Sequence, residues 1–286
     1  MPVTVTPLRY PGGKSQLMPL LVELLRANQL FHCTYIEPFA GGCGLALGLL
    51  LEGKVARLHI NDIDPSIHAF WHSVLYKTDA LLDRMWRTPI TIEEWHRQRR
   101  VQTDGRSSML TLGFSTLFLN RTNRSGILKA GVIGGLSQQG NYLLDCRFNK
   151  NDLERKIVEI SQYRNAIELT SLDALELVGS LHKKYGEHTL VNLDPPYYKR
   201  GPELYTSFYE HNDHASLSFM VQKLKLPWMV TYDDCEAIRN LYAESYCQTI
   251  PLRYSAQEKR KATELLITPR ALALPLDFFE EENRAA

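Results

Sequence analysis

Residues 34–51 of the chain read TYIEPFAGGCGLALGLLL. The first three residues predict a short buried strand, and the leucine-rich run at 45–51 predicts a helix. Between them, Gly41, Gly42 and Gly44 suit a tight turn whose backbone a ligand can approach closely. A second apolar run at 55–60 predicts another strand, which ends at an Asn-Asp pair. This order of strand, glycine turn, helix, strand and acid indicates a βαβ unit of a parallel sheet.

The same alternation resumes after residue 165. Strands are expected at 166–170, 189–193 and 228–232, helices at 172–184 and 235–242, and a terminal hairpin at 245–252 and 262–268. Between the two α/β parts the patterns are mainly helical, and a polar, glycine-rich run at 120–140 favours loops or a β-hairpin. We therefore expect an α/β fold, with a Rossmann-like sheet domain formed by residues 1–75 and 166–286. A mainly helical insert carrying a β-hairpin would occupy residues 76–165.

Composition narrows the class of protein. The chain has 286 residues, 44% of them hydrophobic, and a formal net charge of +1. It holds no run of about 18 apolar residues that could span a bilayer and no signal-peptide pattern, so we expect a cytoplasmic protein without a membrane partner. The five cysteines are scattered without C-x-x-C spacing, which suggests neither a disulfide framework nor a metal site. Residues 76–165 hold 15 Lys and Arg against 9 Asp and Glu, a net charge of +6, which predicts either a polyanion partner or a solvated helical face.

The glycine turn is not the dinucleotide fingerprint G-x-G-x-x-G, because the third position counted from Gly42 is Leu47. Asp62, at the end of the next strand, can accept hydrogen bonds from both hydroxyls of a ribose. The pattern favours a nucleoside ligand without a pyrophosphate, such as S-adenosylmethionine (SAM), over a turn needed only for packing. The run PGGKS at 11–15 is not a phosphate-binding loop, because Leu8 stands where that loop needs glycine. Lys14 in this run could instead meet a carboxylate, such as the methionine end of that cofactor.

The run DPPY at 194–197 follows a strongly apolar strand, so it should lie at the carboxyl edge of the sheet, where open α/β sheets bind ligands. Two prolines remove two N–H groups and keep the backbone extended. The Asp194 carboxylate and the Pro195 carbonyl could then accept hydrogen bonds from N6 of adenine and aim its lone pair at a sulfonium methyl group. Tyr197 could stack on a base that has left the duplex. A cytosine-C5 enzyme would need a nucleophilic Cys after the prolines, and a zinc deaminase would need P-C-x-x-C.

Four motifs in this order resemble the Dam-like, D12-class adenine-N6 DNA methyltransferases: RYPGGK at 9–14, EPFAGGCG at 37–44, NDID at 61–64 and DPPY at 194–197. The resemblance covers nearly the whole chain. It implies a SAM-dependent methyltransferase sheet, a target-recognition domain in the insert and double-stranded DNA as the substrate. The catalytic residues it implies are Asp194, Pro195, Pro196 and Tyr197. The implied SAM contacts are Tyr10, Lys14, Glu37, Phe39, Ala40, Gly41, Gly42, Gly44, Asp62, Ile63, Asp173 and Asp194.

The family's recognition hairpin has a pattern like F-N-G-L-x-R, and the matching run here is RSGILK at 124–129. Arginine and lysine suit guanine edges and phosphates, while asparagine suits adenine. The expected DNA contacts are Arg9, Asn120, Arg121, Asn123, Arg124, Ser125 and Lys129. GATC is one candidate recognition site. A cognate restriction endonuclease acting on the same site is a candidate partner, and a monomer or weak dimer is expected.

Two other functions stay open at this point. Enzymes that methylate RNA or cytosine N4 usually carry Asn or Ser before Pro-Pro, where this chain has Asp194. A non-catalytic DNA-binding regulator with the same fold would not need Asp194, Tyr197, Asp62 and Lys14 intact. The residues thus favour an adenine-N6 DNA methyltransferase over both.

Overall fold

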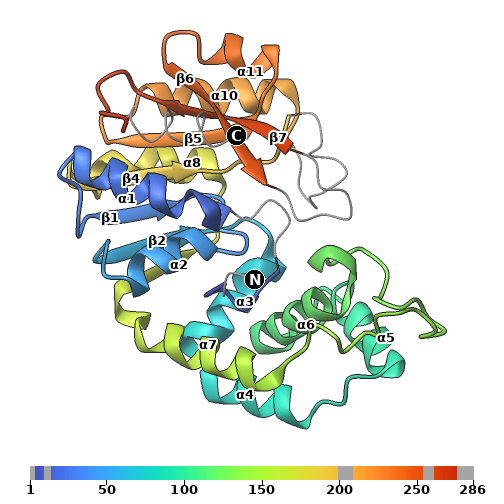
Figure 1. The fold of residues 1–286 in the computed structure, drawn as a ribbon. Coiled ribbons are helices and arrows are strands. Elements are labelled where there is room, and N and C mark those ends of the chain that lie inside the picture. Colours follow the sequence, from blue (N-terminus) through green and yellow to red (C-terminus); the bar gives the residue numbers. More distant parts are fainter. Residues whose placement is uncertain (1–3, 10–13, 199–208, 254–260, 276–286) are drawn as a thin grey trace.

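A seven-stranded sheet forms the centre of the fold, in the order β3-β2-β1-β4-β5-β7-β6 (Figure 1). The computed structural model describes residues 4–9, 14–198, 209–253 and 261–275, without the side chains of 251–253, 261 and 262. The strands are β1 (Thr34–Glu37), β2 (Arg57–Asn61), β3 (Ile167–Thr170), β4 (Thr189–Leu193), β5 (Trp228–Asp233), β6 (Tyr246–Arg253) and β7 (Lys261–Thr268). β1 to β5 are parallel, and β7 runs antiparallel to both β5 and β6. The predicted α/β fold with a Rossmann-like sheet is confirmed.

The chain order of the strands reverses between β1 and β4. From β1 the chain moves outward to β2 and β3 on one side, and later to β4 and β5 on the other. Open α/β sheets bind ligands outside the carboxyl ends of their strands at such a reversal. The glycine turn follows β1 directly, and the DPPY run follows β4 directly. Both motifs therefore leave the sheet where this fold places its ligands.

Helices cover both faces of the sheet. One face packs against α1 (Met18–Ala27) and α2 (Gly44–Leu51), and the other against α8 (Ala174–Ser180), α10 (His211–Gln222) and α11 (Glu236–Leu241). Alternation along the strands divides the core in the same way. Tyr35 belongs to the first apolar cluster, while its neighbour Ile36 belongs to the second. Both faces of a parallel sheet are buried by this arrangement, which explains the near-continuous apolar runs of β1 and β4.

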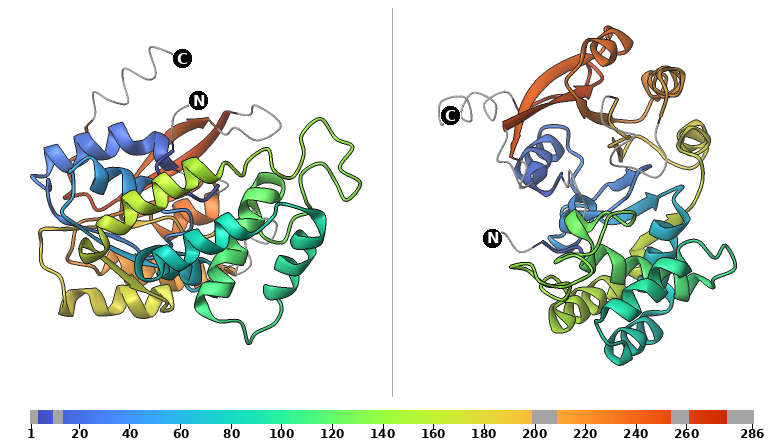
Figure 2. Two further views of the ribbon diagram at one scale, coloured as in Figure 1. Left: turned by 90° about the horizontal axis from the view of Figure 1, so that it is seen from below. Right: turned by 90° about the vertical axis from the view of Figure 1, so that its right-hand side faces the viewer.

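The middle of the chain is helical, as the sequence predicts. It contains α4 (Thr78–Arg87), α5 (Ile92–Val101), α6 (Met109–Thr122) and α7 (Lys150–Gln162), and α6 packs along α3 (Pro65–Tyr76). In Figures 1 and 2 these helices lie away from β6 and β7. Side chains cap the first turn of several of these helices: Asp64 caps α3, Thr91 caps α5, Ser108 caps α6 and Asn149 caps α7. The domain boundaries at residues 76 and 165 stay a prediction.

The glycine-rich run at 120–140 consists mainly of turns and loops, the first of the two expected alternatives. Its first three residues form the last turn of α6, and a short 3-10 turn, η2 (Arg124–Gly126), follows. The expected β-hairpin is present only as one isolated antiparallel bridge, between Asn123 and Val132. Glycines at positive φ, such as Gly126 (78°) and Gly134 (81°), turn the chain before a ladder can form. In the described part of the chain, no helix is long and apolar enough to cross a membrane.

Candidate active site

Asp194 stands at the carboxyl end of β4 and is the partly open acid of the site. Its side chain is 29% exposed. The Thr231 hydroxyl, on the neighbouring strand β5, donates to Asp194 Oδ1 at 2.9 Å. Lys14 Nζ lies 3.3 Å from the same oxygen. The hydroxyl and the cation hold the carboxylate in place and leave part of it free to meet a ligand.

Behind Asp194, three buried side chains from distant parts of the chain share one polar cluster. Lys14 comes from the 3-10 turn η1 (Lys14–Leu17), Tyr197 from the DPPY run and Glu264 from β7. The Lys14 ammonium pairs with Glu264 and donates to the Tyr197 oxygen at 3.0 Å. Tyr197 in turn donates to Glu264 Oε1 at 2.6 Å. Burial raises the pKa of Glu264, and the Lys14 charge opposes that rise.

The Tyr197 side chain is only 8% exposed, which bears on its expected stacking role. Its hydroxyl is anchored by Glu264 and Lys14, and the Lys14 ammonium lies 5.1 Å from the centre of its ring. In this conformation Tyr197 fixes the DPPY run against β7. Its stacking on a base stays a prediction.

The glycine turn after β1 is tied down by side chains from three directions. Gly41 takes φ of 46° and Cys43 takes φ of 52°, both in the left-handed region. The Thr6 hydroxyl donates to the Gly42 carbonyl at 2.5 Å, and the Trp71 indole donates to the Gly41 carbonyl at 3.0 Å. The Gly41 amide instead donates to Asp62 Oδ2 at 2.8 Å. The backbone of the turn is therefore held in one shape by α3, the N-terminal segment and the end of β2.

Asp62 and Ile63 follow β2 beside this turn. The second Asp62 oxygen accepts the Asp64 amide at 2.9 Å, so each oxygen holds one backbone hydrogen bond and keeps a further lone pair. Burial raises the pKa of Asp62 to about 7, against the stabilising effect of the two amides. Ile63 is 49% exposed, an apolar surface directly beside a carboxylate. A ribose and an attached flat ring need such a pairing of acceptor and apolar surface.

The remaining predicted cofactor contacts stand at neighbouring strand ends. Glu37, at the end of β1, is buried and accepts from Asn192 Nδ2 at 3.3 Å. Burial raises its pKa to about 8. Asp173 is exposed and caps α8 through the Leu175 amide at 2.8 Å. Ala40 and Gly44 lie in the buried turn, Phe39 is half-buried beside it, and Tyr10 lies outside the described residues.

Three of the residues expected to contact DNA are buried in this structure, and their contact with DNA stays a prediction. Asn120, Arg121 and Asn123 are 2%, 9% and 0% exposed. Asn120 bonds to the backbone amide and carbonyl of Arg9, both at 2.7 Å, and Arg121 donates to the Pro7 carbonyl. Asn123 accepts from the Trp95 indole at 2.6 Å. Polar side chains at the buried end of a helix must be satisfied internally, so these three brace the backbone of the N-terminal segment and the next loop.

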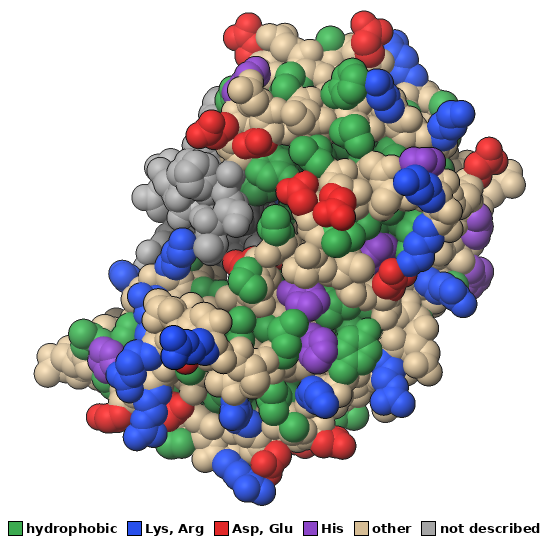
Figure 3. Space-filling view, turned by 180° about the vertical axis from the view of Figure 1, so that it is seen from behind, with side chains coloured by type: hydrophobic (Ala, Val, Ile, Leu, Met, Phe, Trp, Pro, Cys, Tyr) green, Lys and Arg blue, Asp and Glu red, His purple; other side chains and the backbone are tan. Residues whose placement is uncertain are grey.

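The other expected DNA contacts are accessible. Arg124, Ser125 and Lys129 are exposed, and Arg9 is half-buried with its guanidinium donating to the Asn123 carbonyl at 3.3 Å. Seen from behind, Lys and Arg side chains gather over the lower part of the molecule, at the lower left of Figure 3. Arg97 and Arg100 on α5, which belong to the basic segment 76–165, are also exposed. The basic charge of this segment is thus largely on the surface.

A scan against protein families matches one family over residues 10–260, described as D12 class N6 adenine-specific DNA methyltransferase. The matched range is most of the chain and includes the glycine turn, Asp62 and the DPPY run. The chain belongs to the D12 class of N6 adenine-specific DNA methyltransferases. This membership makes it an enzyme of the SAM-dependent methyltransferase type whose substrate is DNA.

This D12-class methyltransferase was also compared with curated proteins and with solved structures. A search of curated proteins finds no match. Among solved structures, it is similar to a Pyrococcus horikoshii protein proposed to be an RNA methyltransferase, with 9% identity and a TM-score of 0.42. That match covers 91% of this chain and 83% of the other. The family match favours DNA and adenine over the RNA and cytosine alternatives.

Several residues of the methyltransferase site were missed by the sequence analysis. Glu264 carried one available signal, because it is an acid directly before the apolar run at 265–267. Trp71 and Thr231 carried none, because nothing in an apolar helix or strand marks the side chain that will meet a turn or a carboxylate. In the residues that the structure describes, no group of His, Cys, Asp and Glu side chains is placed to hold a metal ion.

Proposed function

We propose that the chain transfers a methyl group from SAM to N6 of an adenine in duplex DNA, with Asp194 as the central catalytic residue. One observation carries this proposal. Asp194, with its carboxylate partly open, follows β4 at the reversal of strand order, next to the β1 end that carries the glycine turn. The acid and the turn are thereby neighbours at one edge of the sheet.

The residues around the turn fit SAM as the cofactor. Asp62 keeps lone pairs for ribose hydroxyls, Ile63 offers an exposed apolar face, and Asp173 offers an exposed carboxylate for an amino group. The methyl group of Thr6 lies beside Gly44, 3.4 Å from where a Cβ would stand, so the N-terminal segment packs against the turn. When bound, SAM supplies a methyl group on a positively charged sulfur.

The DPPY run fits an exocyclic amine as the methyl acceptor. The Asp194 carboxylate and the Pro195 carbonyl accept hydrogen bonds from the two N–H bonds of N6. These bonds draw the lone pair out of the ring and orient it, so positioning and electrostatics supply the catalysis. The neighbouring Lys14 cation and the Thr231 hydroxyl hold the carboxylate in place for this role.

The position of Asp194 also favours base flipping. The acid lies at the edge of a sheet inside the protein, and an amino group stacked within a duplex could not reach it. The exposed Arg124, Ser125 and Lys129, with Arg9 beside them, would contact the DNA around the extruded base, and GATC is the site we propose to test first.

The decisive experiment incubates duplex DNA and, in a parallel reaction, RNA with the protein and SAM carrying an isotopically labelled methyl group, and then identifies the labelled nucleosides by mass spectrometry. We expect labelled N6-methyladenine from the wild type and a loss of at least about 1000-fold in rate from Asp194→Ala. Asp83→Ala, an exposed change on α4, is the control and should keep wild-type activity. Labelled N4-methylcytosine, label only in RNA, or full turnover by Asp194→Ala would each refute the proposal.

A further inference from the structure

A row of polar side chains crosses the β2–β3 margin of the sheet. His59 and Asn61 alternate with Leu58 and Ile60 on β2, and Glu168 and Thr170 hold the paired positions on β3. On β1 the neighbouring position of the same face is Ile36, which pairs with His59 and lies in the apolar core under α8. His59 and Asn61 are only 3% and 0% exposed, so each polar group in the row needs a partner within the protein.

Asn61 joins three strand ends at once. Its Nδ2 donates to the carbonyls of Pro38 and Leu172, both at 3.0 Å. Its Oδ1 accepts from the Leu172 amide and the Thr170 hydroxyl, both at 2.8 Å. Pro38 precedes the glycine turn, Leu172 precedes Asp173, and Asn61 itself precedes Asp62. One buried carboxamide therefore holds the three segments that carry the proposed cofactor contacts.

The donor and the acceptor of each hydrogen bond can be assigned in turn from Asn61 to Thr170 and on to His59. The amide oxygen only accepts, so the Thr170 hydroxyl must donate to it. The Thr170 oxygen can then only accept from His59 Nε2, which lies 2.9 Å away. Nε2 therefore carries a proton. Burial lowers the pKa of His59, which favours the neutral ring, so His59 Nδ1 is an acceptor for the Tyr185 hydroxyl at 2.9 Å.

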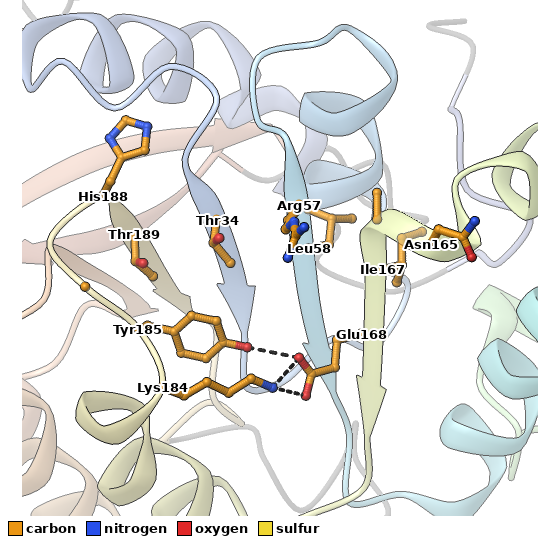
Figure 4. Close-up of a pocket in the computed structure, with 12 residues that line it drawn as sticks. Thr34, Arg57, Leu58, Asn165, Ile167, Glu168, Lys184, Tyr185, His188 and Thr189 are labelled. Atoms are coloured by element: carbon orange, nitrogen blue, oxygen red, sulfur yellow. Dashed lines mark hydrogen bonds and ion pairs between the residues drawn. The ribbon is translucent and has the colours of Figure 1, made fainter.

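The outer end of this chain of hydrogen bonds reaches a cavity of about 460 Å³ at the amino ends of β1 to β4 (Figure 4). Tyr185, Glu168 and Lys184 line it, and Glu168 pairs with Lys184. The Tyr185 hydroxyl also lies 3.1 Å from Glu168. The single Tyr185 proton is therefore shared between the Glu168 carboxylate and His59 Nδ1, and the contact with His59 is the shorter of the two. The row thus connects the edge opposite the active site with Asn61.

We propose that Thr170 and His59 are positioning residues of the cofactor site, because the relay Tyr185–His59–Thr170 holds the Asn61 carboxamide in the orientation that shapes the SAM-binding loops. This inference rests on the proposed function. Thr170 and His59 would touch neither SAM nor DNA. Their effect is on how well three strand-end segments are ordered before SAM binds, so it falls on SAM affinity and leaves the chemical step unchanged.

A matched pair of variants at one position tests the relay. Thr170→Val keeps the methyl group and the side-chain volume but removes the hydroxyl, whereas Thr170→Ser keeps the hydroxyl and removes the methyl. We expect the valine variant to weaken SAM binding, measured by isothermal titration calorimetry, roughly 10-fold, and the serine variant to stay within about 2-fold of the wild type. The kcat at saturating SAM and the Kd for DNA should not change in either variant.

The other outcomes contradict either the relay or the proposed function, and they can be told apart. Equal SAM affinity in the wild type and Thr170→Val, or losses in both variants that follow their melting temperatures, would show a structural role only. A wild type that binds no SAM would refute the proposed function itself. Should the valine variant fail to fold, Tyr185→Phe decides, because only its hydroxyl is removed. About a 3-fold loss of SAM affinity is expected there, and an unchanged affinity would overturn the inference.

Discussion

At the scale of single residues, the site is organised around one cation shared by two carboxylates. Lys14 Nζ lies beside both Asp194 and Glu264, but the two acids differ in access: the Asp194 side chain is 29% exposed and the Glu264 side chain 3%. Removing one partner of a buried pair leaves an unpaired charge, which costs more than the pair itself contributes. Glu264 therefore fixes the position of Lys14, while Asp194 stays open to a ligand.

Thr231 should affect the chemical step through Asp194. Thr231→Val removes the hydroxyl that donates to Asp194 Oδ1 and keeps the shape of the side chain. We expect kcat to fall about 10-fold, with KM for SAM unchanged, because the carboxylate loses one of the groups that orient it. Steady-state kinetics on duplex DNA measures both constants. Thr231→Ser keeps the hydroxyl and should stay close to the wild type; equal losses in the two variants would contradict the role.

Glu37 should make stability depend on pH. Its pKa rises from 4.5 in the unfolded chain to about 8 on burial, so folding takes up a proton between these values. Stability is fully present below about pH 4.5 and falls as pH rises towards 8. Relative to the wild type, Glu37→Gln should gain roughly 3 kcal/mol between pH 5 and pH 8. Urea unfolding at both pH values measures this. Glu52→Gln, at an exposed position, is the control, and identical pH profiles for wild type and Glu37→Gln would refute the prediction.

At the scale of elements, the contact between α3 and α6 sets how the helical part attaches to the sheet domain. The two helices approach closely at Gly113, where a Cβ would lie 2.4 Å from the Ala69 carbonyl oxygen and 2.4 Å from the Ser73 hydroxyl. α3 also carries Trp71, which holds the Gly41 carbonyl of the glycine turn. The helix that packs against α6 is thus also the helix that holds the glycine turn.

Gly113→Ala should therefore destabilise the protein although alanine favours helices. Backbone atoms must move to admit the new methyl group, and we expect a loss of about 2 kcal/mol in the free energy of unfolding. Gly179→Ala on α8 is a matched control, because its Cβ would meet only the flexible end of Met220, at 3.0 Å. Chemical denaturation compares the two. A Gly113→Ala variant as stable as Gly179→Ala would show that the two helices can separate freely.

At the scale of the whole molecule, charge and chemistry are divided between different parts of the chain. Residues 76–165 carry a net charge of +6 within a chain of net charge +1, and several of their cations are exposed. The strand ends carry the acids of the site: Glu37, Asp62, Asp173 and Asp194. A basic surface attracts DNA over several ångströms, while an acid at a strand end acts only on the groups that reach it.

Lys129 tests the DNA-binding surface. Lys129→Gln should weaken DNA binding and reduce the slope of log Kd against log salt by about one unit, because one phosphate contact is lost. Fluorescence anisotropy over a salt series measures the slope. Lys183→Gln, an exposed lysine outside the basic segment, should leave it unchanged. Equal slopes for wild type and Lys129→Gln would remove Lys129 from the proposed interface.

The sequence by itself determined the sheet and the edge of it at which the motifs meet. Short runs of three to six mainly apolar residues, each closely followed by an acid, predicted the strands β1, β2 and β4, because burial in a parallel sheet leaves a local pattern. The carboxyl ends of parallel strands meet at one edge, so the order of motifs along the chain was enough to bring Gly41, Asp62 and Asp194 together.

Only the tertiary structure decided which polar side chains are internal and with whom they pair. Lys14 and Glu264 are 250 residues apart, and Asn61 and Leu172 are 111 apart. Asn120, Arg121 and Asn123 looked like DNA contacts in the sequence but are buried against the N-terminal segment. Local periodicity reports whether a position is apolar, but it carries no information about the distant group that will satisfy a buried hydrogen bond. Packing alone brings such partners together.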